Sequence, residues 1–222
     1  MIVRSRLRQA GGLLLAALLG TGCAATVKEI RRHPQQARLE QLLDTVLPHT
    51  NSTDKHYWVR VADPSQDRIG LAVLPQRHIY LAEPLVEATD DAILRALIAH
   101  AVAHHRLHHY TQRSVLNVMQ QAAFKAGGAF IPGLSHGHYI GEPVSELLLG
   151  PRQESSADDK TAEYLRRAGC PEEDFARALE FLAEQGFAER IGRTASRGGQ
   201  LTRRAARVRR RAALRAKNLP SS

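Results

Sequence analysis

Two histidines continue an apolar helical stripe in the middle of the chain. The stripe recurs at steps of four, three, four and three residues and consists of Ile93, Leu97, His100, His104 and Leu107. This spacing is that of one face of an α-helix, and the acidic run Thr89-Asp90-Asp91 before it is typical of a helix start. The sequence therefore predicts a helix with two imidazoles, one turn apart, on a face that is otherwise apolar.

Histidines four residues apart on a helix can both reach one metal ion. Zinc needs a third protein ligand, and Glu154 is the best candidate because it opens the run Glu154-Ser155-Ser156-Ala157-Asp158 on a separate predicted helix. Asp158 shares a helix face with Glu154 and can accept the second N–H of a ligating histidine. We therefore predict a zinc site of His100, His104 and Glu154, with Asp158 supporting it from behind.

Other motifs lie around these residues in a specific order. The run Leu74–Leu81, which contains the third predicted strand, precedes Ile98–His105, and Glu154, Ala157 and Asp158 are followed by the turn Arg167–Pro171. In order and spacing this set resembles the HtpX- and BepA-like gluzincin zinc metallopeptidases, peptidase family forty-eight. Their corresponding motifs are Pro-Gly-Gly-x-Ile-Tyr, Leu-Ala-His-Glu-x-x-His, Glu-x-x-Ala-Asp and Arg-Ala-Gly-Tyr-Asp-Pro.

The resemblance implies that His100, His104 and Glu154 bind zinc and that Ala101 occupies the general-base position of the HExxH motif. In an HExxH enzyme the glutamate accepts a proton from the zinc-bound water and passes it toward the leaving nitrogen. An alanine methyl can do neither. Positioned acid–base groups contribute about 10²–10⁴-fold to rate, so we expect proteolysis to be lost or much reduced while zinc binding is retained.

Ala101 also has a purely structural interpretation, because it falls on the apolar flank with Leu94, Leu97 and Ile98. A substitute base could come from Glu142, Glu146, His136 or His138, although no spacing rule places any of them at the metal. We expect the remaining histidines of this helix to form a polar, partly solvated end: His105, His108 and His109.

The order of elements predicts an α+β fold, in which a small N-terminal sheet is followed by a helical zincin-type domain. A helix over about 35–47 comes first, and three short β-rich segments follow at 57–61, 70–74 and 78–81. We expect further helices over 115–124, from Pro143 or Pro151 through Arg167, and from 171 to about 185, with a loop over 127–141 that could act as a lid. The helix with His100 and His104 should face the helix with Glu154.

The N-terminus predicts an exported bacterial protein. Arg4, Arg6 and Arg8 precede the apolar run Gly11–Gly20, which is too short to span a bilayer. The step to Cys23 resembles a lipobox, with Gly20 where leucine is usual, so we expect acylation of Cys23 and anchoring at the periplasmic face of the outer membrane. Simple cleavage to a soluble exported protein is the alternative. If Cys23 is acylated, Cys170 is the one cysteine left in the sequence, and we expect no intramolecular disulfide.

The net charge of +9 is concentrated at the C-terminus. Eleven cations and no acid follow Glu189, so the rest of the chain is slightly negative. A nucleic-acid-binding domain is therefore not indicated. We expect residues 188–222 to form a basic tail, either simply solvated or in contact with anionic lipid or lipopolysaccharide.

These interpretations divide the chain into a signal peptide (1–22), a linker with an amphipathic helix (23–54), a metallopeptidase-like domain (55–187) and the tail. The preferred hypothesis is a zinc-binding peptidase homologue, tethered through Cys23, that binds unfolded envelope polypeptides with little or no hydrolysis. One alternative is an active metalloendopeptidase with a substitute base. Another is a metal-free structural lipoprotein that acts through its basic tail.

Overall fold

The computed structural model describes residues 27–50, 56–63, 68–109, 138–191 and 194–218, and side chains from 150 onward in the fourth range. The predicted α+β class is confirmed: one sheet and a layer of helices share one apolar core. The leader, the predicted 115–124 helix and residues 127–137 of the predicted loop lie outside the described residues. Among the described helices, none has the length and apolar content needed to cross a membrane.

The sheet has five strands in the described part of the chain, in the order β1-β3-β2-β4-β5. They are β1 (Trp58–Ala62), β2 (Ile69–Leu74), β3 (His78–Ala82), β4 (Ala188–Ile191) and β5 (Thr194–Ser196). β1 is parallel to β3 and β2 is parallel to β4, whereas β2–β3 and β4–β5 are antiparallel. The three predicted strands are therefore present, and two strands from the C-terminal region extend the sheet.

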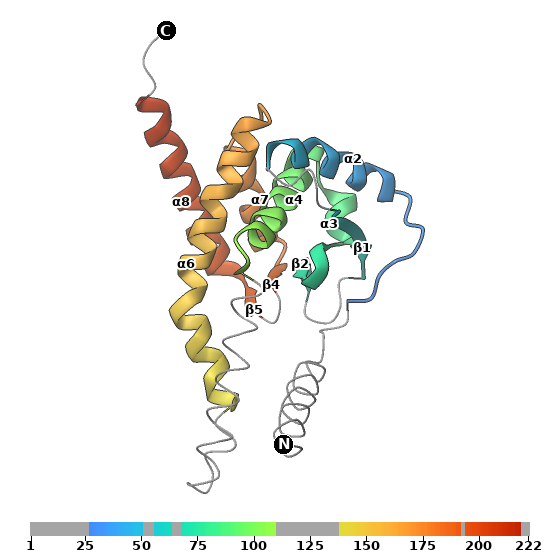
Figure 1. Ribbon diagram of the computed structural model, residues 1–222, viewed down its shortest axis with the longest axis horizontal. Coiled ribbons are helices and arrows are strands. Elements are labelled where there is room, and N and C mark those ends of the chain that lie inside the picture. The colour runs from blue at the N-terminus through green and yellow to red at the C-terminus, as the bar shows by residue number, and fades with distance from the viewer. Residues whose placement is uncertain (1–26, 51–55, 64–67, 110–137, 192–193, 219–222) are drawn as a thin grey trace, which may run out of the picture.

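Helix α4 (Asp91–Arg106) lies at the centre of the helical layer (Figure 1). It contacts α2 (Gln36–Val46), α6 (His138–Arg167), α7 (Glu173–Glu184) and strand β2. The short elements η1 (Leu47–His49), η2 (Pro75–Arg77) and α3 (Glu83–Ala88) connect the layers. Because α4 is covered on all these sides, every residue from Ala96 to His104 is buried. As predicted, this helix faces α6.

Helix α6 begins at His138, earlier than either predicted start, so residues 138–141 are helical rather than part of a loop. It ends at Arg167, as expected. Helix α7 also follows the prediction, with Glu173 and Asp174 in its first turn and Gly186 after its end at a φ of 67°. This left-handed backbone favours glycine.

Strand β4 is joined to β2 through an irregularity at Gly70. Ile69 pairs with Ala188, but Leu71 pairs with Glu189, so Gly70 is the extra residue of a bulge. A Cβ on Gly70 would lie 2.8 Å from Leu182 Cδ2 and 2.9 Å from Phe187 Cβ, closer than real contacts allow. The bulge leaves Leu71 facing the main core while Ile69 packs on the other side of the sheet. Glu189, opposite Leu71, therefore faces the helices.

The region predicted as a basic tail is folded. After β4 and β5, helix α8 (Gly198–Lys217) packs along α7 and contacts α6 (Figure 1). Its buried stripe recurs at helical spacing and contains Leu201, Ala205, Val208 and Ala212. The predicted boundary after residue 187 is thus not a boundary in the structure, because the helix is amphipathic and its small apolar residues are hidden among arginines in the sequence.

Ion pairs attach α8 to the helices beside it. Arg209 pairs with Glu180, with 3.0 Å between Nε and Oε1, while Arg211 pairs with Asp159 and Arg215 with Glu172. These pairs lie largely at the surface, where each contributes at most about 1 kcal/mol. Several charges expected to be available to anionic partners are therefore engaged within the domain.

Candidate metal centre

Helix α4 positions the two histidines. It starts at Asp90, whose side chain accepts a hydrogen bond from the Ile93 amide, and the helix then carries His100 and His104 inward on the buried face. Both imidazoles have no solvent exposure, and their Nε2 atoms lie 3.0 Å apart. The predicted pair therefore converges on one point inside the protein.

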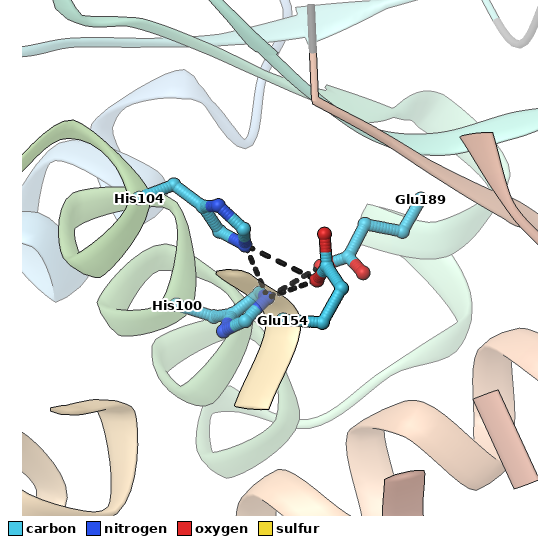
Figure 2. A group of neighbouring side chains, drawn as sticks. All are labelled: His100, His104, Glu154 and Glu189. Atoms are coloured by element: carbon cyan, nitrogen blue, oxygen red, sulfur yellow. Dashed lines mark hydrogen bonds and ion pairs between the residues drawn. The ribbon is translucent and has the colours of Figure 1, made fainter. Parts of the chain in front are cut away.

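Glu154 approaches this point from α6, as predicted. Its Oε2 lies 3.3 Å from His104 Nε2 and 3.8 Å from His100 Nε2. Figure 2 shows the two imidazoles from one helix opposite the carboxylate from the other. The structure thus brings all three predicted ligands together, although fifty residues separate His104 from Glu154 in the chain.

The remote nitrogen of His100 is held by a threonine. Nδ1 of His100 lies 2.9 Å from Thr161 Oγ1, and that hydroxyl donates to the Ala157 carbonyl at 2.7 Å. Because the hydroxyl proton is used there, Thr161 accepts from Nδ1–H, and the Nε2 lone pair of neutral His100 points into the site. Thr161 therefore makes the contact that we assigned to Asp158.

His104 is oriented by a longer chain of hydrogen bonds. Ser156 Oγ donates to the Gln153 carbonyl at 2.9 Å and lies 3.2 Å from His109 Nε2, while His109 Nδ1 lies 3.1 Å from His104 Nδ1. Ser156 thus accepts from His109 Nε2–H, and His109 Nδ1 accepts from His104 Nδ1–H. His109 is buried and takes part in the site, contrary to the expected solvated helix end.

Two residues of the site were missed from the sequence. Glu189 on β4 is fully buried, and its Oε1 lies 2.8 Å from His100 Nε2. Arg204 on α8 is also buried and donates to Glu189, and its Nη1 lies 3.2 Å from Glu154 Oε2. Arg204 could have been found from the sequence, because its spacing from Leu201 and Val208 places it on the apolar face of a helix. No comparable pattern marks Glu189.

Asp158 lies beside the site but serves Arg204. Its Oδ1 accepts from Arg204 Nη2 at 2.7 Å, and both its oxygens lie within 3.3 Å of Arg204 Nε. The same Nη2 lies 2.9 Å from His100 Nε2. Asp158 therefore supports the centre by fixing the guanidinium, with Thr161 and His109 in contact with the histidines themselves.

The charges of the cluster are strongly coupled. Burial disfavours charge on His100, but the carboxylates of Glu189 and Glu154 outweigh it and raise the pKa of His100 to about 9. Burial also opposes ionisation of Glu189, yet Arg204 and His100 bring the pKa of Glu189 down to about 2. For His104, burial prevails and its pKa is lowered. Glu154 and Glu189 are thus ionised and His100 favours its protonated form, so a metal ion that binds here must displace that proton.

This arrangement fits a zinc ion. Two hydrogen-bond chains turn both Nε2 atoms toward one point, so that His100 and His104 can share one cation once both are deprotonated. Ligand atoms about 2.0–2.1 Å from a tetrahedral zinc lie about 3.3–3.4 Å from one another, close to the 3.0–3.8 Å that separate the nitrogens and Glu154 Oε2. His100, His104, Glu154 and Glu189 all offer donor atoms within 4.8 Å of each other.

Ala101, which the resemblance assigns to the general-base position, carries no titratable group. Ala101 is fully buried and belongs to the apolar core, next in sequence to His100. Of the substitute bases considered, His136 and the side chains of Glu142, Glu146 and His138 lie outside the described part of the structure. Cys23 does so as well.

Comparison with known proteins agrees with this site. A search of curated proteins found no significant match. The family model described as Peptidase family M48 matches residues 33–211, which include both histidines, Glu154, Glu189 and Arg204. Because this match covers most of the sequence, the chain belongs to peptidase family M48.

Proposed function

We propose that this member of the family binds one zinc ion through His100, His104 and Glu154 and has lost all or most peptide hydrolysis. The observation that carries the proposal is Ala101, a buried methyl beside an intact ligand set. Zinc, when bound, supplies a Lewis acid that polarises a carbonyl and lowers the pKa of water. The chain's own task in hydrolysis, to accept and return a proton, has no group at residue 101 to perform it.

The size of the expected defect follows from general acid–base catalysis. Loss of a positioned base costs about 10²–10⁴-fold in rate. Binding of a polypeptide needs no such base and can persist. We therefore propose that the protein binds unfolded or extended polypeptides of the cell envelope, in a chaperone-like or scaffolding role similar to that of HtpX- and BepA-like proteins without their cleavage step.

An exposed aromatic residue supports the polypeptide-binding part. Trp58 begins the outermost strand β1 and is 41% exposed. Its ring stacks on His78, which stacks in turn on Tyr80 across the face of the sheet. Side chains of an extended polypeptide can pack on these rings. The backbone of β1 is itself engaged at Val59 by Gln36 and at Val61 and Ala62 by residues 29–30, so we propose contact through the rings rather than strand addition.

The envelope location rests on the sequence of the leader. We propose export, acylation of Cys23 and attachment to the periplasmic face of the outer membrane. The cations of α8 add a proposed contact with anionic lipid or lipopolysaccharide, limited by the ion pairs that Arg209, Arg211 and Arg215 already form.

Zinc content and cleavage, measured together, test the proposal. The mature protein is analysed for metal and incubated with casein, with and without a chelator, and with His104→Ala as the control. One zinc per chain, with no more cleavage than the control, supports the proposal, and suppressed aggregation of an unfolded client would add the binding role. Chelator-sensitive cleavage that disappears in His104→Ala would overturn it.

One observation favours a second candidate, an active metalloendopeptidase with a substitute base. Glu189 adds a carboxylate to the cluster at a place that the family motif does not assign. Casein cleavage that depends on both Glu189 and zinc would establish this function. A protein without zinc would instead leave the metal-free structural lipoprotein. Replacement of the exposed arginines Arg203 and Arg210 of α8 by glutamine would then weaken binding to anionic envelope polymers.

A further inference from the structure

We propose that Glu189 is a fourth protein ligand, so that the zinc site is closed rather than open to substrate. The inference rests on the proposed zinc binding and deepens it. Catalytic zinc sites keep one position open beside three protein ligands, whereas structural sites use four. The described residues offer four donors from three elements: His100 and His104 on α4, Glu154 on α6 and Glu189 on β4.

The position of the Glu189 carboxylate supports direct ligation. Oε2 is bound to Arg204 Nη1, which leaves Oε1 turned toward the histidines, 2.8 Å from His100 Nε2. Oε1 is buried and receives no hydrogen bond from the described residues. Thr161 accepts a hydrogen bond from Nδ1–H of His100 and so directs Nε2 toward Oε1 of Glu189. When His100 is deprotonated, a metal ion can bind both atoms in place of the proton.

Charge balance points the same way. Three buried carboxylates, those of Glu154, Asp158 and Glu189, surround the one guanidinium of Arg204, which contacts each of them. A divalent cation between neutral histidines makes the group neutral. Buried charge without compensation is costly, so the second carboxylate of the cluster is matched to a metal that stays bound.

A closed site explains more than the missing base does. With four protein ligands there is no free position at which a water or a substrate carbonyl can be activated. Restoring the base alone should therefore fail, and Ala101→Glu should remain inactive on casein unless Glu189 is also removed. The zinc would then serve to hold α4, α6 and β4 together.

Cobalt substitution tests the coordination directly. Co²⁺ replaces zinc in the wild type, in Glu189→Gln and in Glu180→Gln, the last a control that removes a carboxylate paired with Arg209 outside the site. We expect a four-coordinate visible spectrum in the wild type and control that added azide does not change. In Glu189→Gln the spectrum should shift toward a hydrated centre and respond to azide. The zinc affinity of Glu189→Gln, measured by chelator competition, should fall by at least about 10–100-fold. Removal of a residue that only hydrogen-bonds to a ligand already has an effect of this size.

The outcomes separate this inference from the proposed function. No metal in the wild type would refute both. One metal per chain with the same spectrum, azide response and affinity in Glu189→Gln would refute the fourth ligand alone. If Glu189→Gln does not fold, Glu189→Asp keeps the charge for Arg204 but shortens the reach to the metal. It should shift the cobalt spectrum, and an unchanged spectrum would refute the inference.

Discussion

Arg204 Nη2 donates to Asp158 Oδ1 at 2.7 Å, although 46 residues separate the two in the chain. Through this pair, helix α8 is bonded to α6 behind the metal ligands, and Arg204 reaches on to Glu189 on β4. The basic C-terminal helix is in this way part of the candidate metal centre.

Removing the guanidinium should destabilise the whole domain. Arg204→Met leaves the carboxylates of Asp158 and Glu189 buried without their cation, and breaking a buried ion network from one side costs about 3–5 kcal/mol. Urea denaturation in zinc-containing buffer measures the loss. Arg203→Met, at an exposed position of the same helix, should change stability by less than about 0.5 kcal/mol. An Arg204 variant as stable as this control would refute the structural role.

His109 should tune zinc affinity without being a ligand. His109→Ala removes the acceptor of His104 Nδ1–H, and loss of such a partner weakens metal binding about 10–100-fold. Competition with a chromogenic chelator measures the affinity. His108→Asn is the control, since His108 is exposed on the same turn and asparagine tolerates its φ of 56°. Equal affinities in the two variants would contradict the hydrogen-bond chain.

The Asp90 cap predicts a pH dependence of stability. Its hydrogen bond from the Ile93 amide, with Arg177 nearby, lowers the pKa of Asp90 below its ordinary value of 3.8. A depressed carboxyl pKa stabilises the folded state above the unfolded pKa, and this contribution disappears as pH falls through the folded value. Asp90→Ala should cost about 1 kcal/mol at pH 7, and the difference from wild type should shrink below pH 3.8. Asp90→Asn should keep most of the cap at all pH values. A stability difference between wild type and Asp90→Ala that persisted unchanged to pH 2 would contradict the charge effect.

Local sequence patterns and the family resemblance were sufficient to predict the central helix and to name three residues that the structure brings together, His100, His104 and Glu154. The helical stripe through His100 and His104 is long and strongly periodic, and Asp90 marks its start, so helix and ligand spacing follow from one signal. Glu154 was found through its distance from Asp158 and the family resemblance. The partner of Asp158 was predicted wrongly. A hydrogen bond from a histidine to this carboxylate is chemically reasonable, but the sequence pattern could not show that Arg204, on a distant helix, binds Asp158 instead.

The two C-terminal residues of the site, Glu189 and Arg204, could not be predicted from local sequence patterns, for a different reason. In α8 the buried stripe consists largely of alanine and single branched residues among many arginines, so composition suggested a solvated tail. Glu189 could not be predicted because the face of the sheet on which a strand residue lies depends on the register of strand pairing. A bulge shifts that register by one residue. Gly70, more than a hundred residues earlier, carries that bulge.

Gly70 therefore offers a test of how the sheet positions the metal centre. In Gly70→Ala the added Cβ meets Leu182 Cδ2 at 2.8 Å and Phe187 Cβ at 2.9 Å, so the junction between α7 and β4 must shift. Overpacking of this kind costs about 1–3 kcal/mol. Because Glu189 follows Phe187 by two residues, zinc affinity should fall together with stability in urea. Gly199→Ala is the control, since its nearest contact is the flexible end of Arg203 at 3.6 Å, and it should leave both quantities nearly unchanged. Full stability and full zinc affinity in Gly70→Ala would show that β4 can rearrange without moving the carboxylate, and the bulge would then have no part in building the site.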